Sequence, residues 1–417
     1  MQTITEYSWL FLDLNSYFAS VEQQINPALR GKPVAVVPMM TDYTCAIAAS
    51  YEAKAYGVKT GTNVAEAKRL CPGLRCVLAQ HNRYVEYHHK VVDEFINHAP
   101  INKIWSVDEL SCNLPPNKRS AEAASALAGR IREGIWKNVG VAINCSIGVA
   151  SNSFLAKVAT DMQKPNGLVI LDQSNLRDRL FKLDLTDLPG INIRMEQRLH
   201  KAGIKTIEQF WNTSPKHARM IWGSVGGERF WYNLHGYHIP DLETNPSVIG
   251  HSRILDPELR PIDKARQVAR RLTIKAASRM RRQELFATRF YMSARLDDTH
   301  RWAGEMHITP SQDNFTFLEQ LEDMWAIMLQ ETGARRVKKV SVTLHGLKKA
   351  HEINLDLFQT VTPETRRNEA LSQVMDKLNK KYGAETLQLG PAPQTKAGHL
   401  GTKIAFSRVP EMSEFHE

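Results

Sequence analysis

Residues 9–22 read WLFLDLNSYFASVE, and this stretch decides the fold. The apolar run that begins at Trp9 ends at an acid, which predicts a buried strand closing at Asp13. Ser16 then stands near the N-cap of a helix that continues through Glu22. An acid at a buried strand end is costly unless it is paired or bound to a metal. Asp13 is therefore expected to face a positive charge.

Two further acids are adjacent in a second apolar segment. Residues 101–110, INKIWSVDEL, are expected to form a strand that carries Asp108 and Glu109. Other strands are expected at 33–37, 141–149 and 168–171, and helices at 84–98, 120–139 and 153–162. Strands that alternate with helices predict a split βαβ sheet of the ferredoxin-like kind, with helices on one face. The three acids could then converge.

The composition limits the class of protein. A chain of 417 residues is long enough for two to four domains, and no run of 18 apolar residues or signal peptide is present. We therefore expect a soluble cytoplasmic protein with no membrane partner. The five cysteines form no CxxC pair, which favours reduced, buried thiols.

The charge is positive and unevenly distributed. The formal net charge is +10, and residues 251–350 hold 19 Lys and Arg against 12 Asp and Glu. A clustered basic excess attracts polyanions, but charge alone does not separate nucleic acid from a membrane surface or from simple solubility.

Three converging carboxylates suit two Mg²⁺ ions, which prefer oxygen ligands and can hold a polyphosphate while activating a hydroxyl. The alternative is that Asp13 caps the following helix while Asp108 and Glu109 pair with neighbouring Lys or Arg side chains. On spacing alone this alternative is the stronger one.

The resemblance to a known family reverses that balance. Residues 11–22 and 106–109 resemble the two metal-binding motifs of the Y-family DNA polymerases, in the same order and at a similar separation. The likeness continues through residues 50–54, 57–61, 145–152 and 164–167. It implies a low-fidelity, DNA-directed DNA polymerase that bypasses template lesions, a mutator enzyme of DNA repair and the SOS response.

The resemblance also implies roles by position. Asp13, Asp108 and Glu109 would bind two Mg²⁺ ions together with the backbone carbonyl of Leu14. The primer 3′-OH would then attack the α-phosphate of a dNTP. The residues implied to contact the dNTP are Phe18 (the steric gate against a ribose 2′-OH), Tyr51, Lys54 and Lys164.

Several positions depart from the family pattern. The family more often has Arg at position 54, where Lys gives a point charge in place of a bidentate contact. Asn15 stands where a second acid is frequent, and residues 110–114 differ from the usual continuation. None of these departures removes a required metal ligand.

By resemblance the architecture is α/β and multidomain, a right-hand polymerase. It would have a ferredoxin-like palm, small fingers, a helical helix-hairpin-helix thumb and an α+β little finger. The expected divisions are palm 1–18 and 82–172, fingers 19–81, thumb 173–240, linker 241–250, little finger 251–352, and clamp-binding peptide with tail 353–417.

Two segments point to macromolecular partners. Residues 188–191 and 202–204 resemble helix-hairpin-helix elements that meet the phosphates of primer–template DNA, although Asn192 replaces a hairpin glycine. The β sliding clamp would be bound by Asn354, Leu355, Asp356, Leu357 and Phe358, where the family motif usually begins with Gln. An amphipathic edge strand is the alternative for this peptide. The ending 405–410 resembles the tails of polymerase V-type catalytic subunits, which implies accessory SOS proteins.

Two other kinds of protein remain possible on the sequence. A noncatalytic polymerase-like adaptor would bind DNA and the clamp, but it would not need Asp13, Asp108 and Glu109. A helix-hairpin-helix repair factor would explain the basic charge and residues 188–204, but it leaves the buried acids unexplained.

Overall fold

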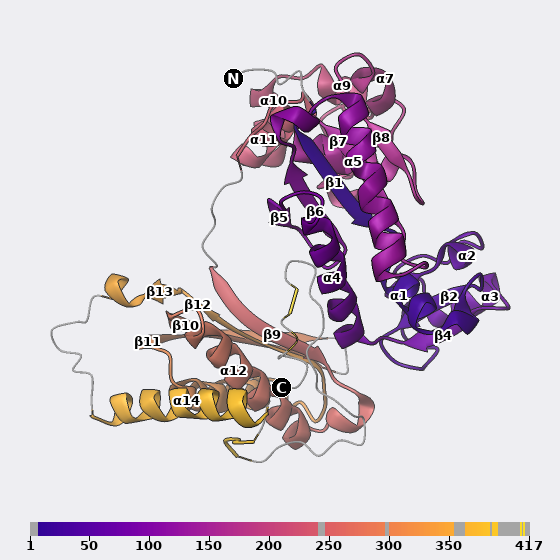
Figure 1. The fold of residues 1–417 in the computed structure, drawn as a ribbon. Helices are drawn as coiled ribbons and strands as arrows, with labels where there is room; N and C mark the ends of the chain where they lie inside the picture. The colour runs from indigo at the N-terminus through magenta and orange to yellow at the C-terminus, as the bar shows by residue number, and fades with distance from the viewer. Residues whose placement is uncertain are drawn as a thin grey trace. The chain divides into compact units, whose positions relative to one another are not determined.

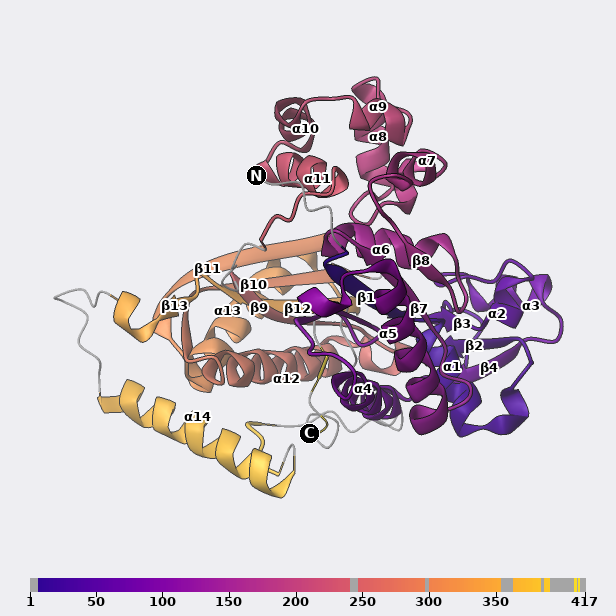
Figure 2. The same cartoon turned by 45° about the horizontal axis from the view of Figure 1, so that its top comes forward.

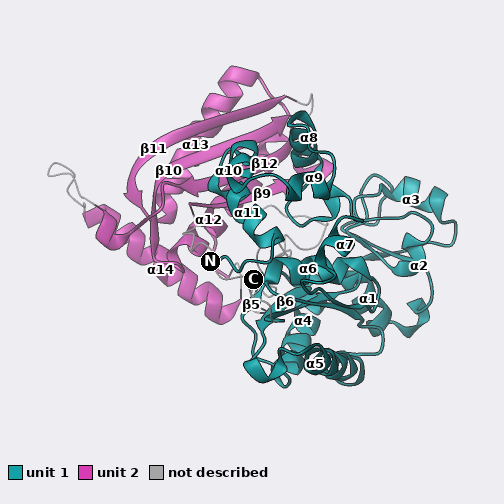
Figure 3. Ribbon diagram, turned by 90° about the horizontal axis from the view of Figure 1, so that it is seen from above, with its two compact units in different colours: residues 1–241, 402–415 teal, residues 242–401, 416–417 magenta. Residues whose placement is uncertain are grey.

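The computed structural model describes residues 7–240, 247–296, 300–353, 363–383, 386–390, 409–410 and 412. The chain divides into two compact units, residues 1–241 with 402–415, and residues 242–401 with 416–417 (Figure 3). No helix in these described ranges is long and apolar enough to cross a membrane.

The first unit is built on a five-stranded sheet whose central strand is β1 (Figure 1). β1 pairs antiparallel with both β6 and β7, and its burial explains why residues 9–14 are almost wholly apolar. The strands, in sheet order, are β5 (Lys103–Ile104), β6 (Glu109–Asn113), β1 (Trp9–Leu14), β7 (Cys145–Ala150) and β8 (Leu168–Ile170).

Helices cover both faces of this sheet, so the expectation of helices on one face was wrong. The side chains of Leu10 and Leu12 belong to one core with helices α4 (His81–Ile96) and α5 (Ala121–Gly134). Phe11 points the other way, as alternation along a strand requires, into a second core with α6 (Ser153–Met162). Asp13 follows Phe11 by two residues in the strand, so its side chain lies on the same face of the sheet and faces α6.

A glycine allows α6 to lie close to the sheet. A Cβ atom on Gly148 of β7 would lie 2.0 Å from the carbonyl oxygen of Ala156 and 2.7 Å from the Cβ of Ala159. No side chain fits in that space, so glycine sets the distance between α6 and the strands.

The expected strand at 101–110 is interrupted, which corrects the sequence prediction. Residues 105–108 form a bend between β5 and β6, where the backbone N–H groups of Trp105 and Ser106 both donate to the carbonyl of Glu109. Asp108 therefore lies in the bend and Glu109 begins the strand. Likewise, residues 141–144 precede β7 and do not belong to it, and residues 135–139 form a π-helical turn after α5.

A small α/β region lies between β1 and α4 in the sequence. Its three-stranded sheet has the order β3-β2-β4, with β2 and β4 parallel. The elements are α1 (Tyr17–Ile25), β2 (Val34–Val37), β3 (Ala48–Ala49), α2 (Tyr51–Lys54), α3 (Val64–Leu70) and β4 (Arg75–Leu78). Ser16 is the N-cap of α1, but its side chain makes no capping hydrogen bond.

The rest of the first unit is helical. It contains α7 (Leu176–Leu180), α8 (Ile193–Lys201), α9 (Ile207–Trp211), α10 (Pro215–Trp222) and α11 (Val225–Leu234). Gly190 and Gly203 have φ angles of +98° and +82°, which explains glycine at the turns before and after α8. Asn192 caps α8 by accepting a hydrogen bond from the Met195 N–H.

The second unit has a four-stranded antiparallel sheet of order β11-β10-β12-β9, with two long helices packed on it (Figure 2). Its elements are β9 (Val248–Ile254), α12 (Ile262–Arg281), β10 (Leu285–Leu296), β11 (Arg301–Ser311), α13 (Asn314–Thr332), β12 (Val337–His345), β13 (Lys348–Lys349) and α14 (Pro363–Tyr382). The expected linker extended too far, because residues 248–250 already pair with β12.

Candidate active site

Two of the three predicted acids meet across paired strands. Asp13 of β1 is the register partner of Glu109 of β6, and the Leu14 N–H donates to the carbonyl of Asp108 at 2.8 Å. Residues directly opposite in antiparallel strands point to the same face. The backbone ladder alone therefore brings the two carboxylates together, although about 95 residues separate them in the sequence.

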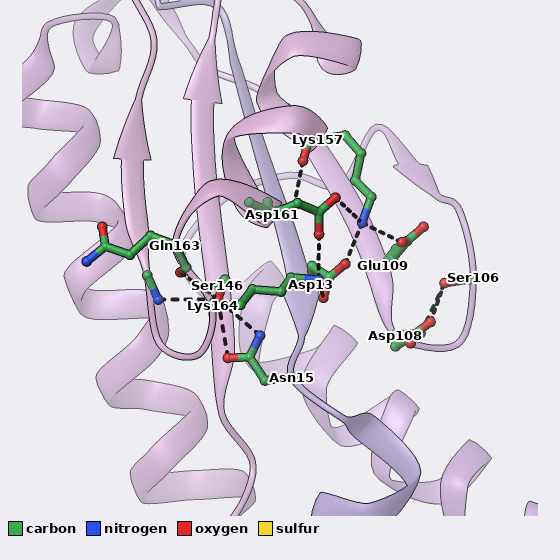
Figure 4. Close-up of polar contacts among 12 residues, drawn as sticks. Asp13, Asn15, Ser106, Asp108, Glu109, Ser146, Lys157, Asp161, Gln163 and Lys164 are labelled. Atoms are coloured by element: carbon green, nitrogen blue, oxygen red, sulfur yellow. Dashed lines mark hydrogen bonds and ion pairs between the residues drawn. The ribbon is translucent and has the colours of Figure 1, made fainter. Parts of the chain in front are cut away.

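Two lysines lie against these carboxylates (Figure 4). The Lys157 ammonium is 2.5 Å from Asp13 Oδ2 and 2.7 Å from Glu109 Oε1. The Lys164 ammonium is 2.6 Å from Asp13 Oδ1 and 2.7 Å from Asp161 Oδ1. The pairing of Glu109 with a nearby lysine is the alternative that the spacing suggested. The idea that Asp13 caps the next helix was wrong, because Ser16 holds the N-cap position.

Asp108 lies apart from this cluster in the bend before β6 (Figure 4). Its Oδ1 accepts a hydrogen bond of 2.5 Å from the Ser106 hydroxyl. Within the described ranges, no group of three acid, cysteine or histidine side chains is arranged to hold one metal ion. Asp13 and Glu109 nevertheless fit a divalent cation, since their oxygens already share one ammonium group. Carboxylate oxygens are also the ligands that hard divalent cations prefer.

Burial and neighbouring charges shift the protonation equilibria of these groups. Burial raises the pKa of Asp108 and of Glu109, with the charge of Asp13 adding to the effect and Lys157 opposing it. Burial would lower the pKa of Lys157, but the charges of Asp13, Asp161 and Glu109 outweigh it and raise the pKa. The Lys157 ammonium therefore stays charged beside these carboxylates.

Phe18 lies on α1 and is packed by an aromatic partner. Its ring stacks on the ring of Tyr84, with centroids 4.3 Å apart and an interplanar angle of 13°. The Tyr84 hydroxyl donates to the buried Glu22 carboxylate at 2.6 Å and accepts from the Gln80 N–H at 3.0 Å. The orientation of the Phe18 ring is thus fixed by a hydrogen-bonded tyrosine.

Tyr51 and Lys54 share the short helix α2, whose N-cap is Ser50. The Lys54 ammonium lies 4.5 Å from the centre of the Tyr51 ring. Burial and the charge of Lys164 lower the pKa of Lys54, and burial raises the pKa of Tyr51. Both side chains are therefore within electrostatic range of Lys164.

Asn15 fixes the loop that carries Lys164. Its Oδ1 accepts from the Asn166 N–H at 2.8 Å, and its Nδ2 donates to the Ser146 hydroxyl at 3.0 Å. Asn166 has a φ of +57°, a conformation that asparagine tolerates better than most residues. An amide at position 15, which can donate as well as accept, thus ties the loop to β1 and β7.

Sequence reasoning missed Lys157 and Asp161. Both lie on α6, one turn apart and facing the acids, and Asp161 interacts with both lysines. The spacing of Lys157 and Asp161 is a signal that was available, because residues four apart share a helix face. The proposed clamp peptide, residues 354–358, lies outside the described residues.

Two family models and curated proteins of known name match this sequence. Residues 12–161 match the impB/mucB/samB family, and residues 246–357 match the C-terminal domain of that family. DNA polymerase IV of Bacillus velezensis is 30% identical over 390 residues, with 91% of each chain covered. DNA polymerase IV of Moorella thermoacetica is 30% identical over 396 residues, with 92% of this chain and 95% of that chain covered.

Solved structures share the fold. A Y-family DNA polymerase chimera of Dbh and Dpo4 matches with a TM-score of 0.69 at 22% identity, covering 82% of this chain and 99% of that chain. An insertion ternary complex of Dbh DNA polymerase matches with a TM-score of 0.55 at 23% identity and similar coverage. The class of protein is therefore a DNA-directed DNA polymerase able to copy past lesions. The chain belongs to the Y family of these enzymes, which use divalent metal ions.

Proposed function

We propose that the residues around Asp13 form the nucleotidyl-transfer site of this polymerase, with two Mg²⁺ ions held by Asp13, Asp108, Glu109 and the Leu14 carbonyl. The observation that carries the proposal is the cross-strand pairing of Asp13 with Glu109, which share one cation. Bound metal ions would polarise the phosphate and favour loss of the primer hydroxyl proton. Asp108 would turn from Ser106 to complete the ligand set.

The dNTP would lie along α2 and the loop after α6. Lys164 and Lys54 would neutralise the triphosphate and the departing pyrophosphate, with Tyr51 supplying a hydroxyl. Phe18, held by Tyr84, would occupy the space that a ribose 2′-OH needs. The burial of Asp13 and the ion pairs around it support a site from which water is largely removed.

Each proposed domain corresponds to one group of helices and strands. The sheet around β1 would be the palm (1–18 and 82–172) and the β3-β2-β4 region the fingers (19–81). The helices α7 to α11 would form the helix-hairpin-helix thumb (173–240). The second unit, beginning with β9 at Val248, would be the little finger, followed by the tail (353–417). The right-hand arrangement of these parts remains part of the proposal.

DNA would be gripped by cations on the sheet of the second unit. Arg295 of β10 is the register partner of both Arg301 of β11 and Lys339 of β12, and all three side chains are exposed. Like charges directly opposite destabilise a sheet, and a row of phosphates would relieve their repulsion. In addition, the N-terminus of α8 after Gly190 would meet a DNA phosphate through its free N–H groups.

Two partners are proposed from sequence motifs alone. Residues 354–358 would bind the β sliding clamp by placing Leu355, Leu357 and Phe358 in an apolar groove. The C-terminal tail would contact accessory SOS proteins.

Primer extension tests the site. Wild-type protein should extend a primer on undamaged and abasic templates with Mg²⁺ and dNTPs, and Asp108→Ala should lose extension. Asp178→Ala, an exposed acid on α7, is the matched control and should extend normally. No extension by the wild type, even with clamp added, would instead favour a noncatalytic adaptor.

A further inference from the structure

Lys157 occupies the position between the two paired acids. Its ammonium contacts carboxylates from two strands, at 2.5 Å from Asp13 Oδ2 and 2.7 Å from Glu109 Oε1. The Lys157 side chain is only 17% exposed, so water screens these contacts little. A lysine placed this way holds two carboxylates together that would otherwise repel each other.

Asp161 offers Lys157 a second acceptor on the same helix. Its Oδ2 is 3.6 Å from the Lys157 ammonium, and its Oδ1 is 2.7 Å from the Lys164 ammonium. The Asp161 carboxylate therefore serves both lysines. If Lys164 leaves for another anion, Asp161 can receive Lys157 over a short distance.

A divalent cation that bridges Asp13 Oδ2 and Glu109 Oε1 needs the same oxygens that Lys157 now contacts. Two positive charges a few ångströms apart in a partly buried site repel strongly. The ammonium and the metal therefore exclude each other, and one must move when the other binds.

We propose that Lys157 is a positioning residue that holds Asp13 and Glu109 in place before the metal binds and moves to Asp161 when a divalent cation replaces it. The proposal rests on the assignment of Asp13 and Glu109 as metal ligands. Its consequence is a coupling: an incoming triphosphate draws Lys164 away from Asp161, which frees Asp161 for Lys157 and so favours metal binding. Nucleotide and metal would then bind in a mutually dependent way.

Mn²⁺ titration followed by electron paramagnetic resonance tests this coupling without catalysis. The full chain is titrated with a dideoxy-terminated primer–template, with and without the matching dNTP. Without dNTP, Lys157→Met should bind Mn²⁺ about fivefold more tightly than wild type, because no ammonium must be displaced. The tightening caused by dNTP should be smaller in this variant.

Asp161→Asn should act in the opposite direction. A displaced Lys157 would then lack an acceptor, and we expect Mn²⁺ binding about threefold weaker than in wild type. General structural damage would weaken binding in both variants, so opposite signs exclude it. The smaller tightening by dNTP in Lys157→Met then separates the exchange from a simple loss of charge. Lys157→Arg keeps the charge and should stay near wild type, as should Lys137→Met, an exposed lysine with the same charge change.

The outcomes test the role of Lys157 separately from the assignment of the metal ligands. Unchanged or weaker Mn²⁺ binding in Lys157→Met overturns the proposal for Lys157. If that variant does not fold, as judged by thermal melting, unchanged or tighter binding in Asp161→Asn overturns it. Wild-type Mn²⁺ binding in Asp13→Asn would instead refute the assignment of the metal ligands.

Discussion

At the scale of single residues, Phe18 is the proposed gate against a ribose 2′-OH. Phe18→Ala should lower the discrimination between dNTP and rNTP about 100-fold, because the space for a 2′-OH would open. The measurement is the ratio of kcat/KM values for a dNTP and its rNTP. Tyr84→Phe keeps the stacked ring and should retain most of the selectivity. Equal selectivity in wild type and Phe18→Ala would contradict the gate.

If Lys54 contacts the triphosphate as proposed, dNTP binding should weaken at alkaline pH. Burial and the charge of Lys164 lower its pKa, so in the folded protein it loses its proton at a lower pH than an ordinary lysine. A neutral Lys54 attracts the triphosphate less, so the KM for dNTP should rise as the pH increases. Lys54→Arg stays charged, and its KM should rise less between about pH 7 and pH 10. Parallel curves for the two proteins would contradict this role.

The sequence predicted some of these residues and not others for a physical reason. Asp13 and Glu109 could be found because acids beside buried strands are unusual and stand in a recognisable motif. Lys157, Asp161 and Tyr84 were missed because a lysine or tyrosine on an amphipathic helix is ordinary until the helix is docked.

At the scale of secondary-structure elements, the close packing of α6 on β7 controls where Lys157 and Asp161 stand. Gly148→Ala should destabilise the protein by about 2–3 kcal/mol, because its Cβ would overlap the Ala156 carbonyl. It should also reduce activity by shifting α6. Urea denaturation measures the free energy of unfolding, and primer extension measures the activity.

Gly129→Ala is the matched control for that substitution. A Cβ there would meet nothing within 4 Å, and the residue lies inside α5. Alanine in a helix interior should be neutral or stabilising by about 0.5–1 kcal/mol. Equal losses in the two variants would contradict the packing argument.

Element boundaries show what a sequence pattern can and cannot predict. The helix at 153–162 was predicted at its observed bounds, because Asn152 caps it and its apolar spacing is regular. The strand expected at 101–110 is split by a bend that depends on hydrogen bonds to Glu109. Such a bend leaves no periodic signal, and neither does the choice of sheet face on which a helix packs.

At the scale of the whole molecule, the positive charge should make DNA binding sensitive to salt. Raising the salt from about 50 to 200 mM should weaken primer–template binding by about 10²–10³-fold, with little dependence on sequence. Arg295→Ala and Lys339→Ala should each lower the slope of log Kd against log salt by about one. Arg266→Ala, on helix α12 and paired with Glu322, should change the slope little. Equal slopes in all variants would contradict binding by this sheet.

The pairing of β1 with β6 has a consequence for how such an enzyme can diversify. Everything from α1 to β5 is inserted between two strands whose mutual register is fixed by their own backbone hydrogen bonds. Lengthening the β3-β2-β4 region within that insertion costs little closure entropy and leaves Asp13 opposite Glu109, whereas α4 must stay because it packs against β1. The surface that would hold the nascent base pair can therefore be rebuilt for new lesions while the reacting centre is inherited unchanged.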